Sequence, residues 1–158
     1  MGDVVLDKMS INDYNSYISN AVENYTQELL KSSRFLSLEE SRDFAIWEYN
    51  DIFKEGFNTI NTYLYNILVS DEKVGIVWVL KENDEGFIGD FLIYEKYRNR
   101  GYGYEALRKL ERTIEYFGVQ KLKLGVFKHN PNALKLYKKV GYSIFREREF
   151  DYTMIKEL

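Results

Sequence analysis

The chain has 158 residues, 45% of them hydrophobic and 30% charged, which is typical of one globular domain with a sizeable core. It contains no cysteine and one histidine. Disulfides, thiolate zinc sites, cysteine nucleophiles and metal sites built from several histidines are therefore excluded, and we expect no metal. The sequence shows neither a signal-peptide pattern nor a run of about 18 apolar residues, so we expect a cytoplasmic protein with no membrane partner.

The net charge of −3 is unevenly distributed. Residues 96–139 carry 12 Lys and Arg against 3 Asp and Glu, a net charge of +9, whereas residues 1–95 have a net charge of −11. A basic segment predicts an anionic ligand, and an acidic first part would attract a cationic one. Because the overall balance is acidic, we expect no nucleic acid as partner; a nucleotide- or nucleic-acid-binding domain that uses 96–139 is the alternative.

The N-terminal part predicts a strand followed by two helices. A capping box, in which a Ser side chain and the residue three positions later bond each other's backbone, introduces each helix. The boxes are Ser10 with Asp13 and Ser37 with Glu40. The expected elements are a strand at 4–6, a helix from 10 to about 31, and a helix from 38 to about 55 that Gly56 ends.

The remaining sequence predicts three strands separated by short polar turns, and then alternating helices and strands. The three strands form an antiparallel meander, while the strand–helix–strand unit that follows needs a crossover and so makes its two strands parallel. The predicted fold class is α/β (α+β), a mixed, mostly antiparallel sheet of six to seven strands with helices on both faces. The expected elements are strands 62–69, 74–80 and 87–93, helix 101–117, strand 121–127, helix 131–140, and strands 142–147 and 150–156.

The stretch YRNRGYG (97–103) predicts an anion site where a strand ends and a helix begins. The first amides of a helix have no partner within the helix, and glycine lets a phosphate approach them closely. Arg98 and Arg100 add charge and donors. The nucleoside-triphosphate P-loop pattern is absent, and antiparallel strands precede the glycines, which is the wrong context for a dinucleotide fingerprint. A glycine-rich turn that only starts a surface helix is the structural alternative.

A second motif lies about 30 residues further on, Asn130-x-x-Ala133-x-x-x-Tyr137-x-x-x-Gly141-Tyr142. Together the two resemble the GNAT superfamily of N-acetyltransferases, with residues 90–103 similar to its motif A and 124–142 to its motif B. The resemblance covers about 87–142. It implies the GNAT fold with a central βαβ acetyl-CoA-binding unit, and acetyl transfer from acetyl-CoA to a primary amine of a small molecule or peptide. A non-catalytic acyl-CoA-binding module of the same fold is the alternative.

The resemblance also implies roles for individual residues. The pantetheine arm would pair with the backbone of Phe91, Leu92 and Ile93, and Asn130 would contact the cofactor. Tyr137 would donate a proton to the CoA thiolate. Each has a structural alternative, since Asn130 before Pro131 suits a helix N-cap and Tyr137 lies in an apolar stripe. The pyrophosphate would bind at the loop made of Arg98, Asn99, Arg100, Gly101, Tyr102, Gly103 and Tyr104.

The general base is less clear from the sequence. Some relatives carry Glu where this chain has Gly125, so that role is not transferred. Asp90 is the candidate, because a lone carboxylate in an apolar strand has a raised pKa unless it is paired. The alternative for Asp90 is a carboxylate that is only satisfied by a neighbouring backbone group or an arginine. His129 titrates in the right range, although a surface-loop histidine is the simpler interpretation, and a water chain with no dedicated base is the last alternative. The acceptor should enter between the N-terminal helices and the last hairpin, whose edge strand makes a homodimer possible.

Acidic residues in the helix 38–55 would attract a polyamine, an aminoglycoside or a peptide amine. The alternative is that these residues only form a solvated helix face.

Overall fold

The computed structural model describes residues 2–158 and contains every helix and strand that the sequence predicts. Several strands are longer than expected, and two short 3₁₀ helices occur in addition. The elements are β1 (Val4–Lys8), α1 (Ile11–Lys31), α2 (Leu38–Ile52), η1 (Gly56–Asn58), β2 (Thr62–Val69), β3 (Glu72–Glu82), β4 (Glu85–Ile93), η2 (Glu95–Tyr97), α3 (Tyr102–Tyr116), β5 (Lys121–Phe127), α4 (Pro131–Val140), β6 (Ser143–Glu147) and β7 (Asp151–Glu157). Among residues 2–158, no helix combines the length and the apolar character needed to cross a membrane.

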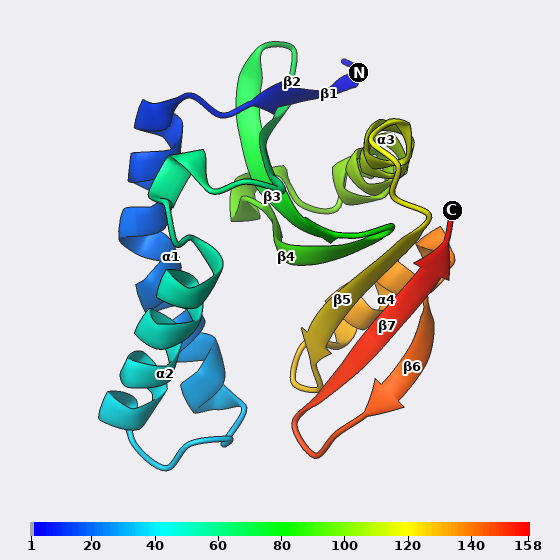
Figure 1. Ribbon diagram of the computed structural model, residues 1–158. Helices are drawn as coiled ribbons and strands as arrows, with labels where there is room; N and C mark the ends of the chain where they lie inside the picture. The colour runs from blue at the N-terminus through cyan, green and yellow to red at the C-terminus, as the bar shows by residue number, and fades with distance from the viewer. Residues whose placement is uncertain (1) are drawn as a thin grey trace.

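The strands form one seven-stranded sheet in the order β1-β2-β3-β4-β5-β7-β6. All neighbours are antiparallel except β4 and β5, as the sequence predicts. That parallel pairing is short, because it joins only Glu85–Ile88 to Lys121–Leu124. Beyond these residues both strands continue but diverge, so the sheet opens into two halves (Figure 1).

Helices cover both faces of the sheet and create two cores. In β3, Ile76 and Trp78 pack under α1 and α2, whereas Val77 and Val79 pack in the core beneath α3 and α4. This follows from the alternation of side chains along a strand. A strand that is buried on both faces reads as a continuous apolar run, which explains the sequence VGIVWVL.

The helices α1 and α2 begin where the capping signals predict, but α2 ends earlier than its sequence predicts. The reciprocal box of Ser10 and Asp13 is formed, whereas Ser37 only accepts a bond from the Glu40 amide. The prediction that α2 reaches Glu55 is wrong, because the helix ends at Ile52. Phe53 leaves helical geometry with a ψ of 60°, and its ring is buried 4.9 Å from that of Trp78. This core contact outweighs the signal of Gly56, which instead begins η1.

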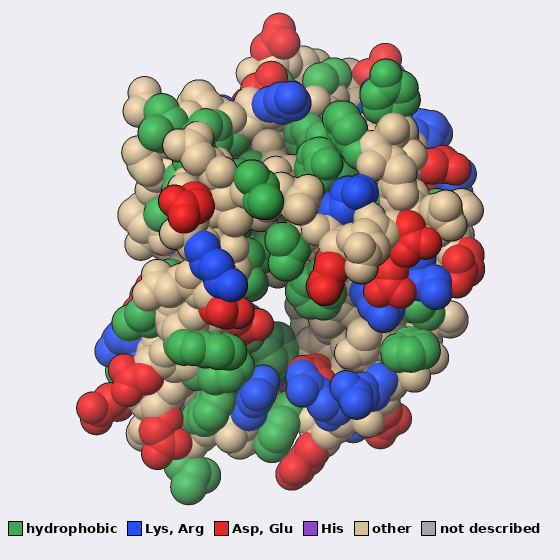
Figure 2. Space-filling view, viewed as in Figure 1, with side chains coloured by type: hydrophobic (Ala, Val, Ile, Leu, Met, Phe, Trp, Pro, Cys, Tyr) green, Lys and Arg blue, Asp and Glu red, His purple; other side chains and the backbone are tan. Residues whose placement is uncertain are grey.

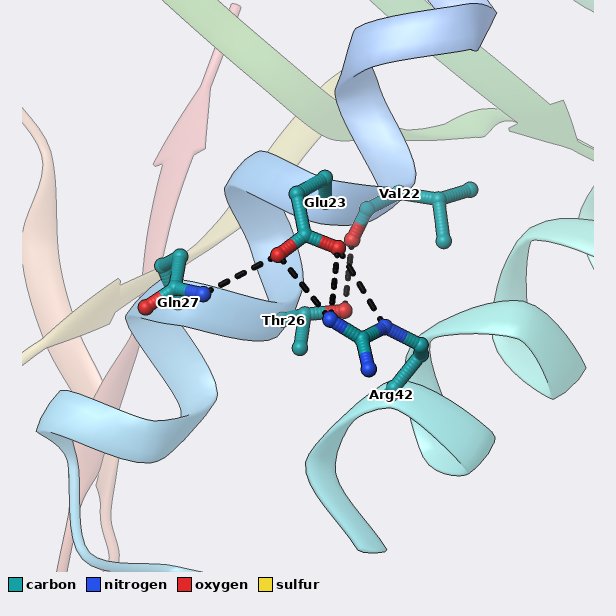
Figure 3. Close-up of polar contacts among 5 residues, drawn as sticks. All are labelled: Val22, Glu23, Thr26, Gln27 and Arg42. Carbon is teal, nitrogen blue, oxygen red and sulfur yellow. Dashed lines mark hydrogen bonds and ion pairs between the residues drawn. The ribbon is translucent and has the colours of Figure 1, made fainter. Parts of the chain in front are cut away.

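A polar cluster joins α1 to α2 (Figure 3). Arg42 of α2 donates to both carboxylate oxygens of Glu23 at 3.1–3.3 Å, and Gln27 donates to the same carboxylate at 3.0 Å. Thr26 bonds the carbonyl of Val22. Exposed ion pairs of this kind contribute little stability, so packing under the two helices holds them against the sheet.

Candidate active site

The opening between β4 and β5 continues into a cleft of about 860 Å³. The helices α1 and α2 form one wall, and the strands β5 and β7 with the start of α4 form the other. Figure 2 shows the hollow on this face of the molecule. The predicted catalytic residues Asp90 and Tyr137 both line this cleft, as do Phe91, Leu92, Arg98 and Asn130 from the predicted cofactor site.

A β-bulge in β4 places Asp90 in the cleft. Trp78 of β3 pairs with Asp90 but the next residue, Val79, pairs with Ile88, so Gly89 is the extra residue. A Cβ atom on Gly89 would lie 1.9 Å from the Trp78 ring, and only glycine fits beneath the indole. The bulge therefore depends on the pair Gly89 and Trp78, which the sequence analysis did not identify.

Asp90 is held by a chain of hydrogen bonds from α1 and β3. The Trp78 indole N–H donates to the Tyr17 oxygen at 2.8 Å, and the Tyr17 hydroxyl donates to Asp90 Oδ2 at 2.7 Å. The direction is fixed because an indole nitrogen can only donate. The Tyr49 oxygen lies 3.4 Å from that of Tyr17. Asp90 is thus satisfied by a tyrosine of the first helix and by the backbone of Phe91. The backbone partner agrees with the alternative from the sequence, whereas no arginine lies within 4.0 Å of its carboxylate among residues 2–158.

The surroundings of Asp90 change its acidity. Burial raises the pKa of the carboxyl group, while the bonds from Tyr17 and the backbone of Phe91 lower it; the net direction is upward. A carboxylate with a raised pKa is a stronger base than an exposed one. This position and this direction are those expected of a general base.

Tyr137 lies in α4 on the other side of the opening. Its side chain is buried beside Phe91 and Tyr142, with ring centroids 6.3 and 6.1 Å away. Its hydroxyl makes no hydrogen bond to any of residues 2–158. Burial and then the negative charge of Asp90 raise the pKa of Tyr137, so the hydroxyl keeps its proton at neutral pH.

The start of α3 differs from the starts of the other α-helices. Side chains cap α1, α2 and α4, whereas Gly101 at the N-cap of α3 supplies none. Gly101 has a φ of +84° and Asn99 a φ of +62°, so the loop turns through left-handed conformations. Within residues 2–158, the amides of Tyr102, Gly103 and Tyr104 have no acceptor. Such a terminus can bind an oxyanion.

The arginines and the second glycine of this loop have structural contacts of their own. Arg98 donates to the carbonyl of Ile93 at 2.7 Å and still lines the cleft. Arg100 donates to the carbonyl of Lys96 at 3.2 Å and lies outside the cleft wall. A Cβ atom on Gly103 would come within 3.0 Å of Leu136, so this glycine also permits close packing of α3 on α4.

Asn130 has the capping role that its place before Pro131 suggests. Its Oδ1 accepts a bond from the Ala133 amide at 3.4 Å, and Pro131 occupies the first helical position. The residue lies at the edge of the cleft as well. Capping and contact with a ligand are compatible, because the cap uses only the carbonyl oxygen of the side chain.

His129 joins the two walls of the cleft. Its Nε2 lies 2.5 Å from a carboxylate oxygen of Glu28 in α1, and its ring stacks on Phe127 at 5.1 Å. From sequence alone, a surface loop was the simpler interpretation. The contact partners are 101 residues apart in the chain, which explains why no local pattern indicated them.

The acidic residues of α2 do not surround the cleft. Of the six acids between 38 and 55, only Glu48 lines it, where it accepts a hydrogen bond from Tyr25. The others are exposed and form the solvated face that the sequence analysis held as an alternative: Glu39, Glu40, Asp43, Asp51 and Glu55.

Comparison with known proteins gives consistent matches. The model of the acetyltransferase (GNAT) family matches residues 23–142. The N-acetyltransferase YycN of Bacillus subtilis (strain 168), itself uncharacterised, is 31% identical over 98% of this chain and 99% of its own length. The crystal structure of YycN superimposes with a TM-score of 0.87 at 29% identity, covering 92% of this chain and 95% of that one.

Two further proteins extend the comparison. The spermine/spermidine N(1)-acetyltransferase of Bacillus subtilis (strain 168) is 25% identical over 77% of each chain. The PaiA N-acetyltransferase of Thermoplasma acidophilum, solved in complex with coenzyme A, has a TM-score of 0.74 at 16% identity and covers 99% of both chains. The likeness to PaiA concerns the fold alone.

Proposed function

We propose that this chain, which belongs to the acetyltransferase (GNAT) family and is an acetyl-CoA-dependent N-acetyltransferase, acetylates a primary amine of a small molecule or peptide. The amine attacks the thioester of acetyl-CoA directly. One observation carries the proposal. Asp90 and Tyr137, a carboxylate and a phenol with raised pKa values, line one cleft from opposite sides of the opening between β4 and β5.

In this proposal acetyl-CoA binds along the opened edge of β4. Phe91, Leu92 and Ile93 pair with β3 but no longer with β5, which leaves backbone groups on their other side for the pantetheine arm. The pyrophosphate binds at the uncapped start of α3, residues 99–104, beside Arg98. Asn130 contacts the cofactor from the start of α4.

Asp90 accepts the proton that the attacking amine must lose. A Lys-like amine has a pKa of about 10.4 in water and attacks only when neutral. Tyr17 keeps the Asp90 carboxylate oriented toward the cleft. Amide groups of β4 stabilise the negative charge that develops on the thioester oxygen as nitrogen attacks carbon.

Tyr137 gives its proton to sulfur as the carbon–sulfur bond breaks. The ammonium group of the acceptor loses one proton to Asp90 and then attacks as the neutral amine. After the attack the nitrogen loses a second proton, which replaces the one that Tyr137 gave to sulfur, so that the amine is acetylated, CoA leaves as a thiol and Asp90 ends protonated. The raised pKa of Tyr137 keeps its proton in place but also makes it a weaker acid. Proton transfer from Tyr137 to the sulfur of CoA is favourable only if the sulfur lies in the same buried surroundings. Burial raises the pKa of the CoA thiol as well, so the negative sulfur that forms as the bond breaks takes the proton more readily.

The test combines binding with turnover. Acetyl-CoA, but not ATP or NAD, should raise the melting temperature, since ligand at 100 times its dissociation constant adds about 2.7 kcal/mol. The variant Tyr137→Phe should lower kcat about 100-fold or more, with acetyl-CoA affinity unchanged. Release of CoA thiol can be followed without background because the protein has no cysteine.

Tyr142→Phe is the matched control. Tyr142 is buried beside Tyr137, its hydroxyl has no hydrogen-bond partner within residues 2–158, and it does not line the cleft. Equal turnover in wild type and Tyr137→Phe would exclude the proposed acid. Binding of acetyl-CoA without turnover on any amine would favour the non-catalytic acyl-CoA-binding module. The single domain over 1–158 and the cytoplasmic location stay predictions from the sequence.

A further inference from the structure

The end of the cleft near the α1–α2 loop and the last hairpin has a net charge of +1, from four cations and three carboxylates. The cations that line it come from the end of α1, the loop after it and the last hairpin: Lys31, Arg34, Arg146 and Arg148. The carboxylates at this end are Glu28, Glu48 and Asp151. A site shaped for polyamines would show the opposite balance, because like charges repel.

The carboxylates at this end already have partners. Asp151 receives two bonds from Arg148, at 2.6 and 2.8 Å. Glu28 contacts His129 and lies 3.7 Å from Lys31, and the Tyr25 hydroxyl bonds Glu48. They are therefore poorly placed to bind a second cation from a substrate.

Arg34 and Arg146 are different, because neither has a carboxylate within 4.0 Å among residues 2–158. Arg34 lies with its guanidinium 4.5 Å from the ring centre of Phe44 and 5.3 Å from that of Phe35. Stacking orients a guanidinium while its N–H groups remain available at the edge. Arg146 lies on the opposite wall, on β6 beside Thr153 of β7.

The helix α2 gives the separation between Arg34 and the level of Asp90, because residues of this helix lie beside both positions. Tyr49 lies at the level of Asp90, since its oxygen is 3.4 Å from that of Tyr17, the donor to Asp90. Phe44, which stacks on Arg34, is five residues earlier in α2. Five residues of helix span about 7.5 Å. This separation along α2 favours an acceptor whose amine and oxyanion are several bonds apart over an α-amino acid, in which they are two bonds apart.

We infer that the acceptor is a primary amine that carries a carboxylate or phosphate several bonds away, and that Arg34 and Arg146 bind this oxyanion. The inference rests on the proposed function and narrows its substrate class. Guanidinium groups suit both oxyanions because their planar N–H edge matches two oxygens at once. It also separates this protein from relatives whose names specify spermine and spermidine.

The experiment compares acceptors that differ only in the oxyanion. We expect kcat/KM for 6-aminohexanoate or 6-aminohexyl phosphate to exceed that for hexylamine by about tenfold or more, and the preference to shrink as salt rises. Comparing the two anionic acceptors distinguishes carboxylate from phosphate. Spermidine and cadaverine serve as cationic acceptors and should be no better than hexylamine.

Variants assign the preference to residues. The double variant Arg34→Gln with Arg146→Gln should lower kcat/KM for the anionic acceptor about tenfold and leave that for hexylamine unchanged. Arg112→Gln is the control, since Arg112 is an exposed arginine of α3 outside the cleft and should leave both values unchanged.

The outcomes separate this inference from the proposed function. If amines are acetylated but the oxyanion gives no gain, or the double variant keeps the wild-type preference, only this inference fails. A preference for spermidine would overturn it in the same way. If no amine releases CoA although acetyl-CoA still raises the melting temperature, the proposed function fails and the inference with it.

Discussion

The two faces of the opening between β4 and β5 differ in how their polar groups are satisfied. On the α1 and α2 side, Trp78 donates to Tyr17 and Tyr17 donates to Asp90. On the α3 and α4 side, within residues 2–158, neither the Tyr137 hydroxyl nor the first amides of α3 have a partner. Polar groups in such places normally find one. The carboxylate that we propose as the base is thus held by the protein on one face, whereas the groups that we propose to contact acetyl-CoA on the other face have no partner within residues 2–158.

Replacing the fixed carboxylate should have the largest effect. Asp90→Asn keeps an oxygen that can accept from Tyr17 but cannot take a proton, so we expect kcat/KM to fall about 100-fold or more. The wild-type rate should rise with pH through the raised pKa of Asp90, and the variant should lack this rise. Asp84→Asn, at an exposed turn, is the control. A variant with wild-type activity would mean that water or another group is the base.

The same substitution should stabilise the fold. Because burial raises the pKa of Asp90, its folded form holds the proton more tightly than the unfolded chain does. Stability is therefore full below the unfolded value near 3.8 and is lost as pH rises through the folded value. Asp90→Asn does not carry this penalty. Its melting temperature should exceed that of wild type at pH 8 and approach it at acidic pH; a lower value at pH 8 would contradict the assignment.

Removing the Tyr17 hydroxyl, which lies between the Trp78 N–H and the Asp90 carboxylate, should have an intermediate effect on stability and on the pH dependence of the rate. Tyr17→Phe leaves the Trp78 N–H and the Asp90 carboxylate without their partner, which should cost about 1–3 kcal/mol in unfolding free energy. The rise of the rate with pH should move to higher pH, because the bond from Tyr17 lowers the pKa of Asp90. Denaturant melts and a pH–rate profile measure the two effects.

Tyr14→Phe provides the comparison for Tyr17→Phe. Tyr14 is a buried residue of the same helix, and within residues 2–158 its hydroxyl makes no hydrogen bond. We expect this variant to keep the pH profile of wild type. A profile that shifts equally in both variants would show that packing of α1, rather than the hydroxyl of Tyr17, sets the acidity of Asp90.

Local signals predicted the framework well. Strand 121–127 and helix 131–140 have the bounds that their patterns indicated, because turn residues and a terminal glycine mark both ends. The parallel pairing of β4 and β5 followed from the crossover rule. The end of α2 was wrong because the contact of Phe53 with Trp78 joins residues 25 apart in the chain, and no nearby pattern encodes it.

The site was predictable only where one motif contains both partners. Asn130 as a cap and the glycine-rich turn at Gly101 lie beside the groups they serve. Tyr17 belongs to a helical stripe that indicates a core face, and its hydroxyl partner lies 73 residues away. Gly89 was missed for the same reason, because only the Trp78 ring on the neighbouring strand requires glycine at this position. Sequence therefore indicated Asp90 as a candidate, and the structure identifies the side chains that hold it.

The smallest expected effect concerns the start of α3, whose first amides have no partner within residues 2–158. Gly101→Ala places a Cβ at a φ of +84°, which costs about 1 kcal/mol, at the N-cap residue that precedes the amides proposed to bind the pyrophosphate. We expect the affinity for acetyl-CoA to fall about fivefold, the equivalent of about 1 kcal/mol. Isothermal titration and a denaturant melt measure the two quantities separately.

Gly118→Ala makes this measurement decisive. Gly118 has a φ of +90°, and an added Cβ would meet nothing within 4 Å, as at Gly101. The backbone strain is therefore matched, but Gly118 follows the end of α3, whereas Gly101 precedes its start. Equal loss of stability with weaker acetyl-CoA binding only in Gly101→Ala would place the ligand at the open amides. Equal binding in both variants would mean that the start of α3 is left uncapped for some other reason, and that the pyrophosphate binds elsewhere.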